Sequence, residues 1–359
     1  MKRAFDIVLH IPSLGGGGAE RVAVDLAGEF AGRGLSVVVF VHDAAAAYAL
    51  PDGVTLRVAR ARHHLSRVAE FSRLLRRARP RAVVSLLPYA NLITLLAARC
   101  ARTDSRIVVS EHIPAEHQAS TRWRDRLKFA LLTRLYPRAD AIVAVSKGIA
   151  EELEARLGPT ISGKVFVIYN PCYLRAAQPS SGLGDRATPI VLAAGRLVPQ
   201  KGFDTLIKAF SVVRSVVPGA RLIIAGEGAE RSMLEHCIDT LNLDGHVTLP
   251  GFVDDMTMLY RTARLFVCSS RIEGFGNVIV EAMSFGLPVV ATDCRYGPRE
   301  ILAGGRYGDL VPVDDESALA LAILKALGRP ANPEWTIERA SDFSIDAIGQ
   351  RYLDVSGIQ

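Results

Sequence analysis

Short runs of apolar residues alternate with longer segments in which apolar residues recur at helical spacing. The first run, Ile7-Val-Leu-His-Ile11, precedes a glycine-rich loop and a helical pattern from about Ala19 to Arg33, and the next run covers Leu35 to Val41. Runs of this length are typical of buried strands, and the spacing between them is typical of amphipathic helices. Regular alternation of the two predicts a parallel sheet with helices on both faces.

The alternation occurs in two series that are separated by a break. The first series continues through strands predicted at about 82–86, 106–110 and 139–145. Between Tyr169 and Pro189 the pattern stops and proline, serine and glycine become frequent, which predicts a linker. A second series follows, with strands predicted at 190–194, 221–225, 247–249, 265–268 and 289–292.

This organisation predicts an α/β protein made of two doubly wound, Rossmann-like domains. We expect the amino-terminal domain to span residues 1–175 and the carboxyl-terminal domain to span residues 176–335. Residues 336–359 are expected to form terminal helices that could pack back on the amino-terminal domain. A length of 359 residues agrees with two cores rather than one.

Composition narrows the class of protein. The longest nearly uncharged stretch, Ala82 to Ala98, contains Ser85, Pro88 and Asn91, so a strand followed by a helix explains it better than a membrane span does. Five scattered cysteines without a CxxC pair argue against a disulfide framework or a zinc site and favour a reducing compartment. No cleavable signal is recognised before the first strand, so a cytoplasmic location is expected.

Charge is unevenly divided between the two halves. Residues 1–175 have 26 Lys and Arg against 15 Asp and Glu, whereas residues 176–359 have 17 against 22. The cationic first half favours an anionic partner, such as lipid headgroups, nucleic acid or a polyphosphate substrate. In this half, Arg57 to Arg81 is rich in arginine, and Arg122 to Tyr136 interleaves cations with large apolar residues. The latter segment is either an amphipathic helix packed in the core or a helix that lies on an anionic membrane.

The most informative stretch runs from Arg271 to Ala291 and contains two glutamates eight positions apart, Glu273 and Glu281. Glu273 is expected in the loop after a buried strand. Glu281 is expected in the second turn of a helix from Asn277 to Phe285, which Asn277 would cap and Gly286 would close.

The residues between the two glutamates are suited to an anion. Gly274 and Gly276 let the backbone approach a ligand closely, and the helix start offers N–H groups. A phosphate bound there would have a carboxylate on either side to accept hydrogen bonds from hydroxyl groups. The pattern therefore predicts a site for a nucleotide sugar.

A second motif, Gly195 to Gly202, follows the first strand of the second series. Arg196 and Lys201 bracket a turn just before a predicted helix. Arginine can bind a phosphate with two N–H groups and lysine supplies a point charge, so the pair could neutralise a leaving diphosphate. The alternative is two solvated surface cations. The functional interpretation is favoured because the Glu273 loop is expected at the neighbouring part of the same sheet edge.

Taken together, these residues resemble the retaining glycosyltransferases of family 4. Four motifs occur in order and cover nearly the whole chain: Gly16-Gly-Gly-Ala-Glu-Arg21, Gly195-Arg196…Lys201-Gly202, Glu273-Gly-Phe-Gly…Glu281 and Asp293-Cys-Arg-Tyr-Gly-Pro-Arg-Glu300. The resemblance implies the GT-B fold, in which two Rossmann-like parallel-sheet domains face each other across a cleft. It also implies a bacterial enzyme of polyprenyl-linked glycan or envelope polysaccharide assembly.

The resemblance implies a role for each matching residue. Arg196 and Lys201 would hold the diphosphate of the donor, Glu281 would accept from the ribose hydroxyls, and Glu273 would contact the transferred sugar. The glycine loop near residue 16 would lie beside the diphosphate and the acceptor. The expected donor-binding residues are Gly16, Gly17, Gly195, Arg196, Lys201, Glu273, Gly274, Phe275, Gly276, Asn277, Val278 and Glu281. Neither a metal ion nor a cofactor is expected.

Ser110-Glu-His112 ends a predicted strand of the first half. A histidine at a strand end is often structural, but ligands bind at the carboxyl edge of a parallel sheet. An equivalent histidine in the family lines the acceptor side and touches the donor sugar, whereas Glu111 is a weaker candidate. The remaining histidines, including His63 and His64, are expected at the surface. The expected catalytic residues are His112, Arg196, Lys201 and Glu273.

A dinucleotide-binding fingerprint is not supported. The glycines at positions 15–18 lack the last glycine of G-x-G-x-x-G, because Glu20 occupies that place. Gly226 and Gly228 follow another predicted strand, but Arg231 replaces the last glycine there.

The expected function is a retaining, metal-independent transfer of a hexose or N-acetylhexosamine from a nucleoside diphosphate, with UDP favoured. The expected acceptor is a polyprenyl-diphosphate-linked or other glycan, and the expected location is the inner face of the plasma membrane. No second carboxylate is clearly placed as a nucleophile in the first half, which favours front-face substitution through an oxocarbenium-like state. The alternatives are a GDP-mannose-dependent transferase of the same fold and a sugar-nucleotide epimerase. A nucleic-acid-binding protein is disfavoured because the chain has no recognised RNA or DNA motif.

Overall fold

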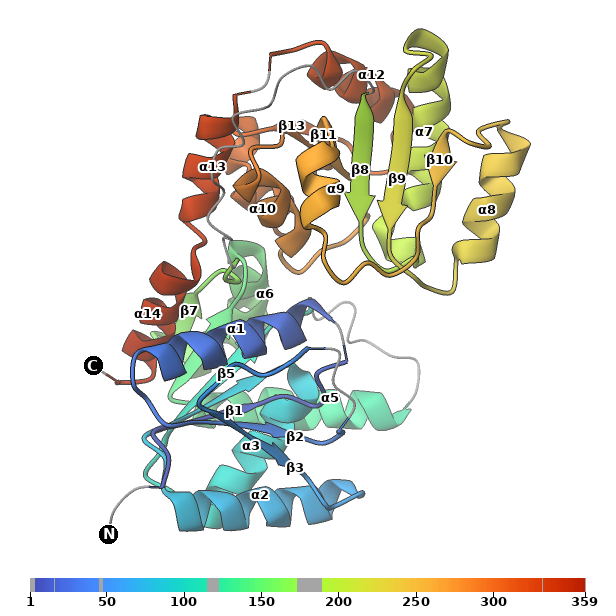
Figure 1. Cartoon of the computed structure of the whole chain (residues 1–359). Helices are drawn as coiled ribbons and strands as arrows, with labels where there is room; N and C mark the ends of the chain where they lie inside the picture. The colour runs from blue at the N-terminus through green and yellow to red at the C-terminus, as the bar shows by residue number, and fades with distance from the viewer. Residues whose placement is uncertain are drawn as a thin grey trace. The chain divides into compact units, whose positions relative to one another are not determined.

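The computed structural model of the chain describes residues 4–15, 17–44, 48–114, 123–172, 189–330 and 332–358. The chain forms two compact units, one of residues 1–173 and 343–359 and the other of residues 174–342. Each unit is built on a parallel sheet, as Figure 1 shows. The predicted doubly wound α/β architecture is thereby confirmed for each unit.

The first unit contains a seven-stranded parallel sheet with the order β3-β2-β1-β4-β5-β6-β7. The order reverses at β1, which pairs with β2 on one side and β4 on the other. The strands are β1 (Ile7–His10), β2 (Val37–Val41), β3 (Val54–Val58), β4 (Ala82–Leu86), β5 (Arg106–Glu111), β6 (Ala141–Ala144) and β7 (Val165–Val167). The helices are α1 (Gly18–Gly32), α2 (His64–Ala78), α3 (Pro88–Ala101), α5 (Trp123–Leu135), α6 (Lys147–Leu157) and α14 (Ile345–Val355), with short 3-10 turns η1 (Tyr136–Arg138) and η2 (Gly158–Ile161).

The second unit contains a six-stranded parallel sheet with the order β10-β9-β8-β11-β12-β13. The order reverses at β8, which pairs with β9 on one side and β11 on the other. The strands are β8 (Ile190–Ala194), β9 (Arg221–Ala225), β10 (Val247–Thr248), β11 (Leu265–Cys268), β12 (Val289–Thr292) and β13 (Asp309–Val311). The helices are α7 (Phe203–Val216), α8 (Arg231–Thr240), α9 (Thr257–Thr262), α10 (Asn277–Ser284), α11 (Pro298–Ile301), α12 (Glu316–Leu327) and α13 (Pro333–Ser341), with 3-10 turns η3 (Pro199–Lys201) and η4 (Ala303–Gly305).

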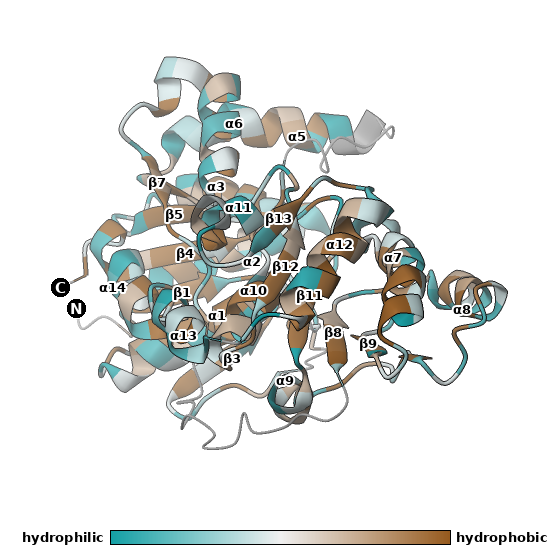
Figure 2. Cartoon of the chain, turned by 90° about the horizontal axis from the view of Figure 1, so that it is seen from above, coloured by the Kyte–Doolittle hydropathy of each residue, from teal (hydrophilic) through white to brown (hydrophobic). Residues whose placement is uncertain are grey.

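The central strands are mostly apolar because helices cover both faces of each sheet. Every residue of β1, β2, β4, β11 and β12 is buried. Figure 2 shows β8 and β11 mostly in brown, the colour of hydrophobic residues. The uncharged stretch from residue 82 to 98 forms β4 and most of α3, as predicted. Among the described helices, none combines the length and the apolar composition that crossing a membrane requires.

Three strands were not predicted from the apolar pattern. β3 lies at the edge of its sheet and exposes four of its five residues, including Arg57. β7 and β13 are edge strands of three residues each, and β13 begins with Asp309. Edge strands are covered on fewer sides, so they need no continuous apolar run, and the pattern misses them.

The carboxyl-terminal residues divide between the two units. α13 belongs to the second unit, where Arg339 donates to the backbone carbonyls of Ile301 and Glu300 at 2.8 and 2.7 Å. α14 belongs to the first unit and packs against α1, with Ile348 and Tyr352 in the core. The division therefore falls near residue 343 and not at residue 336, because Arg339 fixes α13 to the second unit.

Candidate active site

The two motif loops of the second unit lie side by side. β8 and β11 are neighbours, and the strand order reverses at β8. The loop that begins at Gly195 follows β8, and the loop that contains Glu273 follows β11. Ligands of doubly wound sheets bind outside the carboxyl ends of the strands at such a reversal. The fold therefore brings both motifs to the place where this architecture binds ligands.

Glycine lets these two loops approach closely. Gly202 has φ +60°, and a Cβ atom at this position would lie 2.3 Å from the backbone oxygen of Ser269. A side chain would strain the backbone and also push the β8 turn away from the β11 loop. The glycine at the end of the Gly195–Gly202 motif is thus required by the contact between the loops.

Lys201 and Glu273 form an ion pair at the centre of the site. Lys201 Nζ lies 2.5 Å from Glu273 Oε1, and the Ser270 hydroxyl donates to the same oxygen at 2.7 Å. Burial opposes the charge of Lys201, but the carboxylate of Glu273 outweighs it, so the net effect is a raised pKa of Lys201. Burial raises the pKa of the neighbouring Cys268 thiol to about 11. At neutral pH the ammonium is charged and the thiol is neutral.

Arg196 supplies a second cation beside this pair. Its side chain is exposed, and its positive charge acts to lower the pKa of Lys201. Among the described residues, the guanidinium of Arg196 makes no hydrogen bond or ion pair. A guanidinium in this state can bind an anion without first breaking a contact within the protein.

Helix α10 (Asn277–Ser284) begins four residues after Glu273 and contains Glu281. The residue at the N-cap position is Gly276 and not Asn277, which is the first residue of the helix. The reason is the backbone, because φ at Gly276 is +103° and only glycine adopts this value without strain. The first N–H groups of a helix have no acceptor within it and attract negative charge. The start of α10 therefore adds to the positive character of the site.

The fourth motif, Asp293 to Glu300, packs against the backbone of the loop that contains Glu273. Gly297 has φ +89°, and a Cβ atom there would lie 1.7 Å from the backbone oxygen of Phe275, which is itself buried. Arg299 donates to Asp293 at 2.9 Å within the same motif. The segment thus fixes the backbone around Phe275 by direct packing.

Glu281 has a partner that the sequence did not reveal. The hydroxyl of Tyr260 on α9 donates to Glu281 Oε2 at 2.9 Å, and the Tyr260 ring stacks on Phe285 with centroids 5.2 Å apart. Tyr260 is the buried residue of α9, and no motif in the sequence of this helix points to a role in the site. It orients the carboxylate that was expected to meet the ribose.

His112 lies in the first unit, at the carboxyl end of β5. Its Nε2 is 3.0 Å from the Ser110 hydroxyl, which is in turn 3.1 Å from the Tyr352 hydroxyl of α14. Burial lowers the pKa of His112 to about 4, so the ring is neutral at physiological pH. Its Nδ1 is buried and has no partner among the described residues. The ring is held in place and keeps one nitrogen for another contact.

Glu111, the residue before His112, is enclosed in the interior of the first unit. It is buried, and Asn91 Nδ2 donates to its carboxylate at 3.2 Å. The charge of Arg156 also interacts with it. These contacts give Glu111 a structural role in holding the strand end.

Two other histidines, His10 and His42, are buried, although a surface position was expected for them. His10 Nε2 lies 2.8 Å from His42 Nε2, and His10 Nδ1 lies 2.6 Å from the Thr94 hydroxyl. Burial lowers the pKa of His10 well below its ordinary value, and burial also lowers the pKa of His42, to about 4. His10 occupies the last position of a buried strand, where even a polar side chain is enclosed. The expectation of a surface position was wrong for these two, whereas His63 and His64 are exposed.

The structure places the expected site residues in two groups. His112 and Gly17, which precedes α1, belong to the first unit, and Gly16 lies outside the described residues. The other expected residues lie on the two loops and on α10 of the second unit: Gly195, Arg196, Lys201, Glu273, Gly274, Phe275, Gly276, Asn277, Val278 and Glu281.

Comparison with known proteins agrees with this geometry. Residues 16–174 match the family model described as Glycosyltransferase Family 4, and residues 178–343 match the one described as Glycosyl transferases group 1. The chain is 30% identical over 276 residues to the lipopolysaccharide core biosynthesis glycosyltransferase LpsE of Rhizobium meliloti, with coverage of 74% of this chain and 79% of that protein.

Two further relatives are informative. The chain is 30% identical over 234 residues to the N-acetylgalactosamine-N,N'-diacetylbacillosaminyl-diphospho-undecaprenol 4-alpha-N-acetylgalactosaminyltransferase of Campylobacter jejuni, covering 64% of this chain and 62% of that protein, which is less than two thirds of its length. The crystal structure of HepE of Anabaena in complex with UDP superimposes with a TM-score of 0.80 at 22% identity, covering 98% of this chain and 99% of that one. At this identity the likeness shows the fold alone, which is the GT-B fold.

Proposed function

Since the chain belongs to the group 1 and family 4 glycosyltransferases, we propose that it transfers a hexose or an N-acetylhexosamine from UDP to a glycan acceptor. The proposed reaction retains the configuration of the anomeric carbon and needs no metal ion. The observation on which the proposal rests is the cluster of Arg196, Lys201 and Glu273 at the strand-order reversal of the second sheet.

The cluster is suited to a departing diphosphate. As the bond to the sugar breaks, negative charge grows on the diphosphate, and preorganised cations lower the barrier most where that charge develops. Lys201 is held by Glu273, and exposed Arg196 has no partner among the described residues. Together with the start of α10, these two cations could supply the charge that a divalent ion supplies in other transferases.

The carboxylates are suited to the two sugar rings of the donor. Glu281 is oriented by Tyr260, and a carboxylate can accept several hydrogen bonds, including those from the two ribose hydroxyls. Glu273 stands at the other end of the Gly274–Gly276 turn, where the transferred sugar would lie beyond the diphosphate. Both carboxylates accept hydrogen bonds from fixed neighbours, so neither needs to reorganise when the donor binds.

Front-face substitution is the proposed route to retention. A double displacement needs a free carboxylate near the anomeric carbon, but Glu111 is buried and bonded to Asn91. His112 is neutral and has an unpartnered Nδ1 among the described residues. We assign this nitrogen to a hydrogen bond with a hydroxyl of the transferred sugar.

A lipid-linked acceptor fits the first unit. The name of the Campylobacter relative includes a diphospho-undecaprenol-linked acceptor. In this chain the first half is cationic, and α5 exposes Leu127 and Leu131 beside Arg126 and Lys128. We therefore propose a polyprenyl-diphosphate-linked acceptor and peripheral binding to the inner face of the plasma membrane.

A thermal-shift series tests the donor. A ligand that binds only the folded protein stabilises it by about 2.7 kcal/mol at one hundred times its dissociation constant. UDP and UDP-sugars are expected to raise the melting temperature, whereas ADP is not. A shift with GDP alone would favour the GDP-mannose alternative, and no shift with any nucleotide would contradict the proposal.

Product analysis tests the reaction. With the UDP-sugar that gives the largest shift, NMR of the glycoside is expected to show the anomeric configuration of the donor, with turnover unchanged in EDTA. A product of inverted configuration would exclude retention. Formation of a modified free sugar without an acceptor would instead indicate an epimerase.

A further inference from the structure

We propose that Arg271 is a positioning residue, which holds the Lys201 turn against the loop that contains Glu273. The proposal rests on the proposed function, because it concerns how Lys201 is presented to the diphosphate. Arg271 begins the stretch that also contains Glu273, two residues later, but the sequence pattern gives it no role. Its role follows from contacts between segments far apart in the chain.

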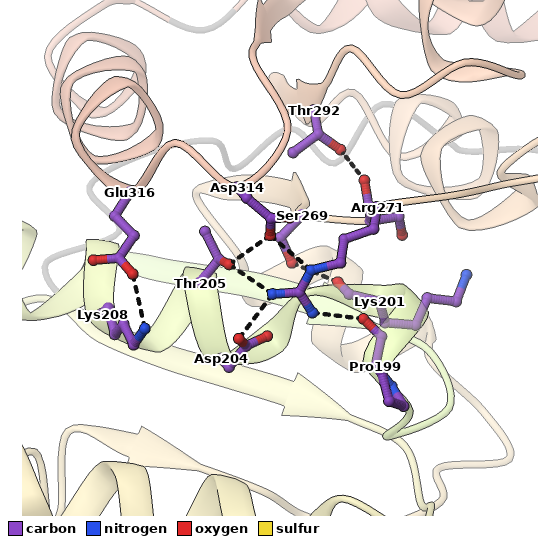
Figure 3. A network of polar contacts seen from close by, with 11 residues as sticks. Pro199, Lys201, Asp204, Thr205, Lys208, Ser269, Arg271, Thr292, Asp314 and Glu316 are labelled. Atoms are coloured by element: carbon purple, nitrogen blue, oxygen red, sulfur yellow. Dashed lines mark hydrogen bonds and ion pairs between the residues drawn. The ribbon is translucent and has the colours of Figure 1, made fainter.

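The guanidinium of Arg271 reaches from the β11 loop to the turn after β8, as Figure 3 shows. Nη1 donates to the backbone oxygen of Pro199 at 2.6 Å, and Nε donates to Asp314 at 2.6 Å. Nη2 donates to Asp204 at 2.8 Å and to the Thr205 hydroxyl at 3.2 Å. A guanidinium offers five N–H groups, so these contacts leave little freedom for the side chain.

The backbone completes the connection between the two loops. The Arg271 N–H donates to the Gln200 oxygen at 2.8 Å, and the Ser269 hydroxyl donates to the Lys201 oxygen at 2.8 Å. With the bond to Pro199, all three carbonyls of η3 accept from the β11 loop. Lys201 is therefore fixed at both ends, by these bonds at its backbone and by Glu273 at its ammonium group.

The negative charge of Asp204 is stabilised by Arg271. Burial opposes the charge of Asp204, but its bonds to Arg271 outweigh burial and give a net lowering of the pKa of Asp204. The other carboxylate oxygen of Asp204 is buried without a partner among the described residues. Loss of Arg271 would leave this carboxylate uncompensated beside the turn, and the turn would be expected to shift to let water reach it.

Steady-state kinetics test whether Arg271 acts through Lys201. With a UDP-sugar, Arg271→Met is expected to lower kcat/KM by about 10- to 100-fold, the cost of a misplacement near 1 Å, and Arg271→Lys by less. Lys201→Ala is expected to lower kcat/KM by at least ~10²-fold. Adding Arg271→Met to Lys201→Ala should then cause little further loss, because the residue that Arg271 positions is already absent.

Hydrogen exchange tests the same role without a donor. In Arg271→Met the amides of residues 195–202 are expected to exchange faster. If this single variant does not fold, the same measurement is made on the double variant Arg271→Met/Asp204→Asn, in which the uncompensated carboxylate is also removed. Arg33→Met is the matched control. Arg33 is 26% exposed against 27% for Arg271, and it binds Glu29 at 2.6 Å and Asp346 at 2.7 Å in the first unit. It should lower stability without changing kcat/KM or the exchange of residues 195–202.

Three results would overturn the positioning role: a kcat/KM of Arg271→Met within about twofold of the unmodified protein, losses that multiply in the double variant, or unchanged exchange of residues 195–202. A different result would reject the proposed function itself, namely an unmodified protein that binds neither UDP nor GDP. In that case the exchange measurement would still decide whether Arg271 holds the turn.

Discussion

Tyr260 shows how one hydroxyl orients a functional carboxylate. Tyr260→Phe keeps the ring on Phe285 and removes the hydroxyl that donates to Glu281. A neutral-to-charged hydrogen bond contributes about 1.5 kcal/mol or somewhat more, so we expect UDP to bind roughly tenfold more weakly. Isothermal titration calorimetry with UDP measures this change.

The control for this variant is Tyr307→Phe. The Tyr307 ring packs on Trp335 with centroids 4.9 Å apart. Tyr307 precedes β13, so it lies at the amino ends of the parallel strands, whereas the site lies at their carboxyl ends. UDP affinity should not change in this variant. Equal losses in both variants would mean that the Tyr260 hydroxyl supports the fold and not the donor.

His112 provides a prediction about pH. Burial lowers its pKa to about 4 from the ordinary 6.5, so NMR of labelled histidine should show a neutral ring at pH 6. Between pH 4 and 6.5 the unfolded chain binds a proton that the folded protein does not. The free energy of unfolding therefore falls as the pH falls through this window, by about 1.4 kcal/mol per pH unit for this residue.

His112→Gln should remove that part of the slope. The comparison is urea unfolding of the first unit at several pH values between 4 and 7. A titration midpoint of His112 near 6.5 would show that the ring is not enclosed as described.

At single residues, sequence reasoning located the groups that belong to local motifs. Lys201 and Glu273 were assigned from their spacing to glycines and strand ends, and the fold places them in contact. Tyr260 and Arg271 were missed because their partners, Glu281 and Asp314, are distant in sequence. Such pairs depend on how elements pack, which a one-dimensional pattern does not encode.

The turn that contains Lys201 allows a prediction at the level of an element. Gly202→Ala would combine the strain of φ +60° with a Cβ atom 2.3 Å from the Ser269 oxygen. We expect a loss of kcat/KM of about tenfold or more, because η3 must move and Lys201 with it. Steady-state kinetics with the UDP-sugar donor measure the loss.

Gly34→Ala is the matched control for that turn. Gly34 has φ +83°, but a Cβ atom there would meet nothing within 4 Å. This variant should cost only the backbone strain, about 1 kcal/mol of stability, and leave the kinetics unchanged. If Gly202→Ala also left the kinetics unchanged, the close contact between the two loops would not contribute to activity.

Elements were predictable where burial imposes a continuous pattern. The strands β1, β2, β4, β11 and β12 are buried on both faces, so their apolar runs identified them. The first residue of α10 was predicted correctly, but its N-cap was assigned one residue late, because the sequence offers Asn277 as a good cap while the backbone requires glycine at position 276. A propensity rule was overridden there by the geometry of the preceding turn.

At the scale of the whole molecule, the chain crosses between its two units twice. α14 contributes Ile348, Tyr352 and Leu353 to the core of the first unit although it lies at the other end of the sequence. Tyr352 also bonds to Ser110, which holds His112. The sequence indicated terminal helices but not this division, because α13 and α14 have similar amphipathic patterns and differ in the surface that each one meets.

Peripheral membrane binding is the prediction that concerns the molecule as a whole. α5 exposes Leu127 and Leu131 at 62% and 39%, one helical turn apart, on the unit with the cationic excess. Replacing both with Gln should weaken sedimentation with phosphatidylglycerol vesicles by about tenfold or more, since two leucines that enter the interface contribute well over 1 kcal/mol. Added salt should weaken binding further by screening the cations.

The chain offers a matched control on the other unit. Val212 and Val216 on α7 are 50% and 60% exposed at the same helical spacing. Their replacement with Gln removes a similar exposed apolar area from a unit whose half of the chain has an acidic excess, so vesicle binding should not change. If both pairs of substitutions weakened binding equally, the attraction would be unspecific, and a membrane-facing role for α5 would have to be abandoned. Binding that was equal on phosphatidylcholine and phosphatidylglycerol vesicles would likewise remove the cationic half from the explanation, because a zwitterionic surface offers it no net charge.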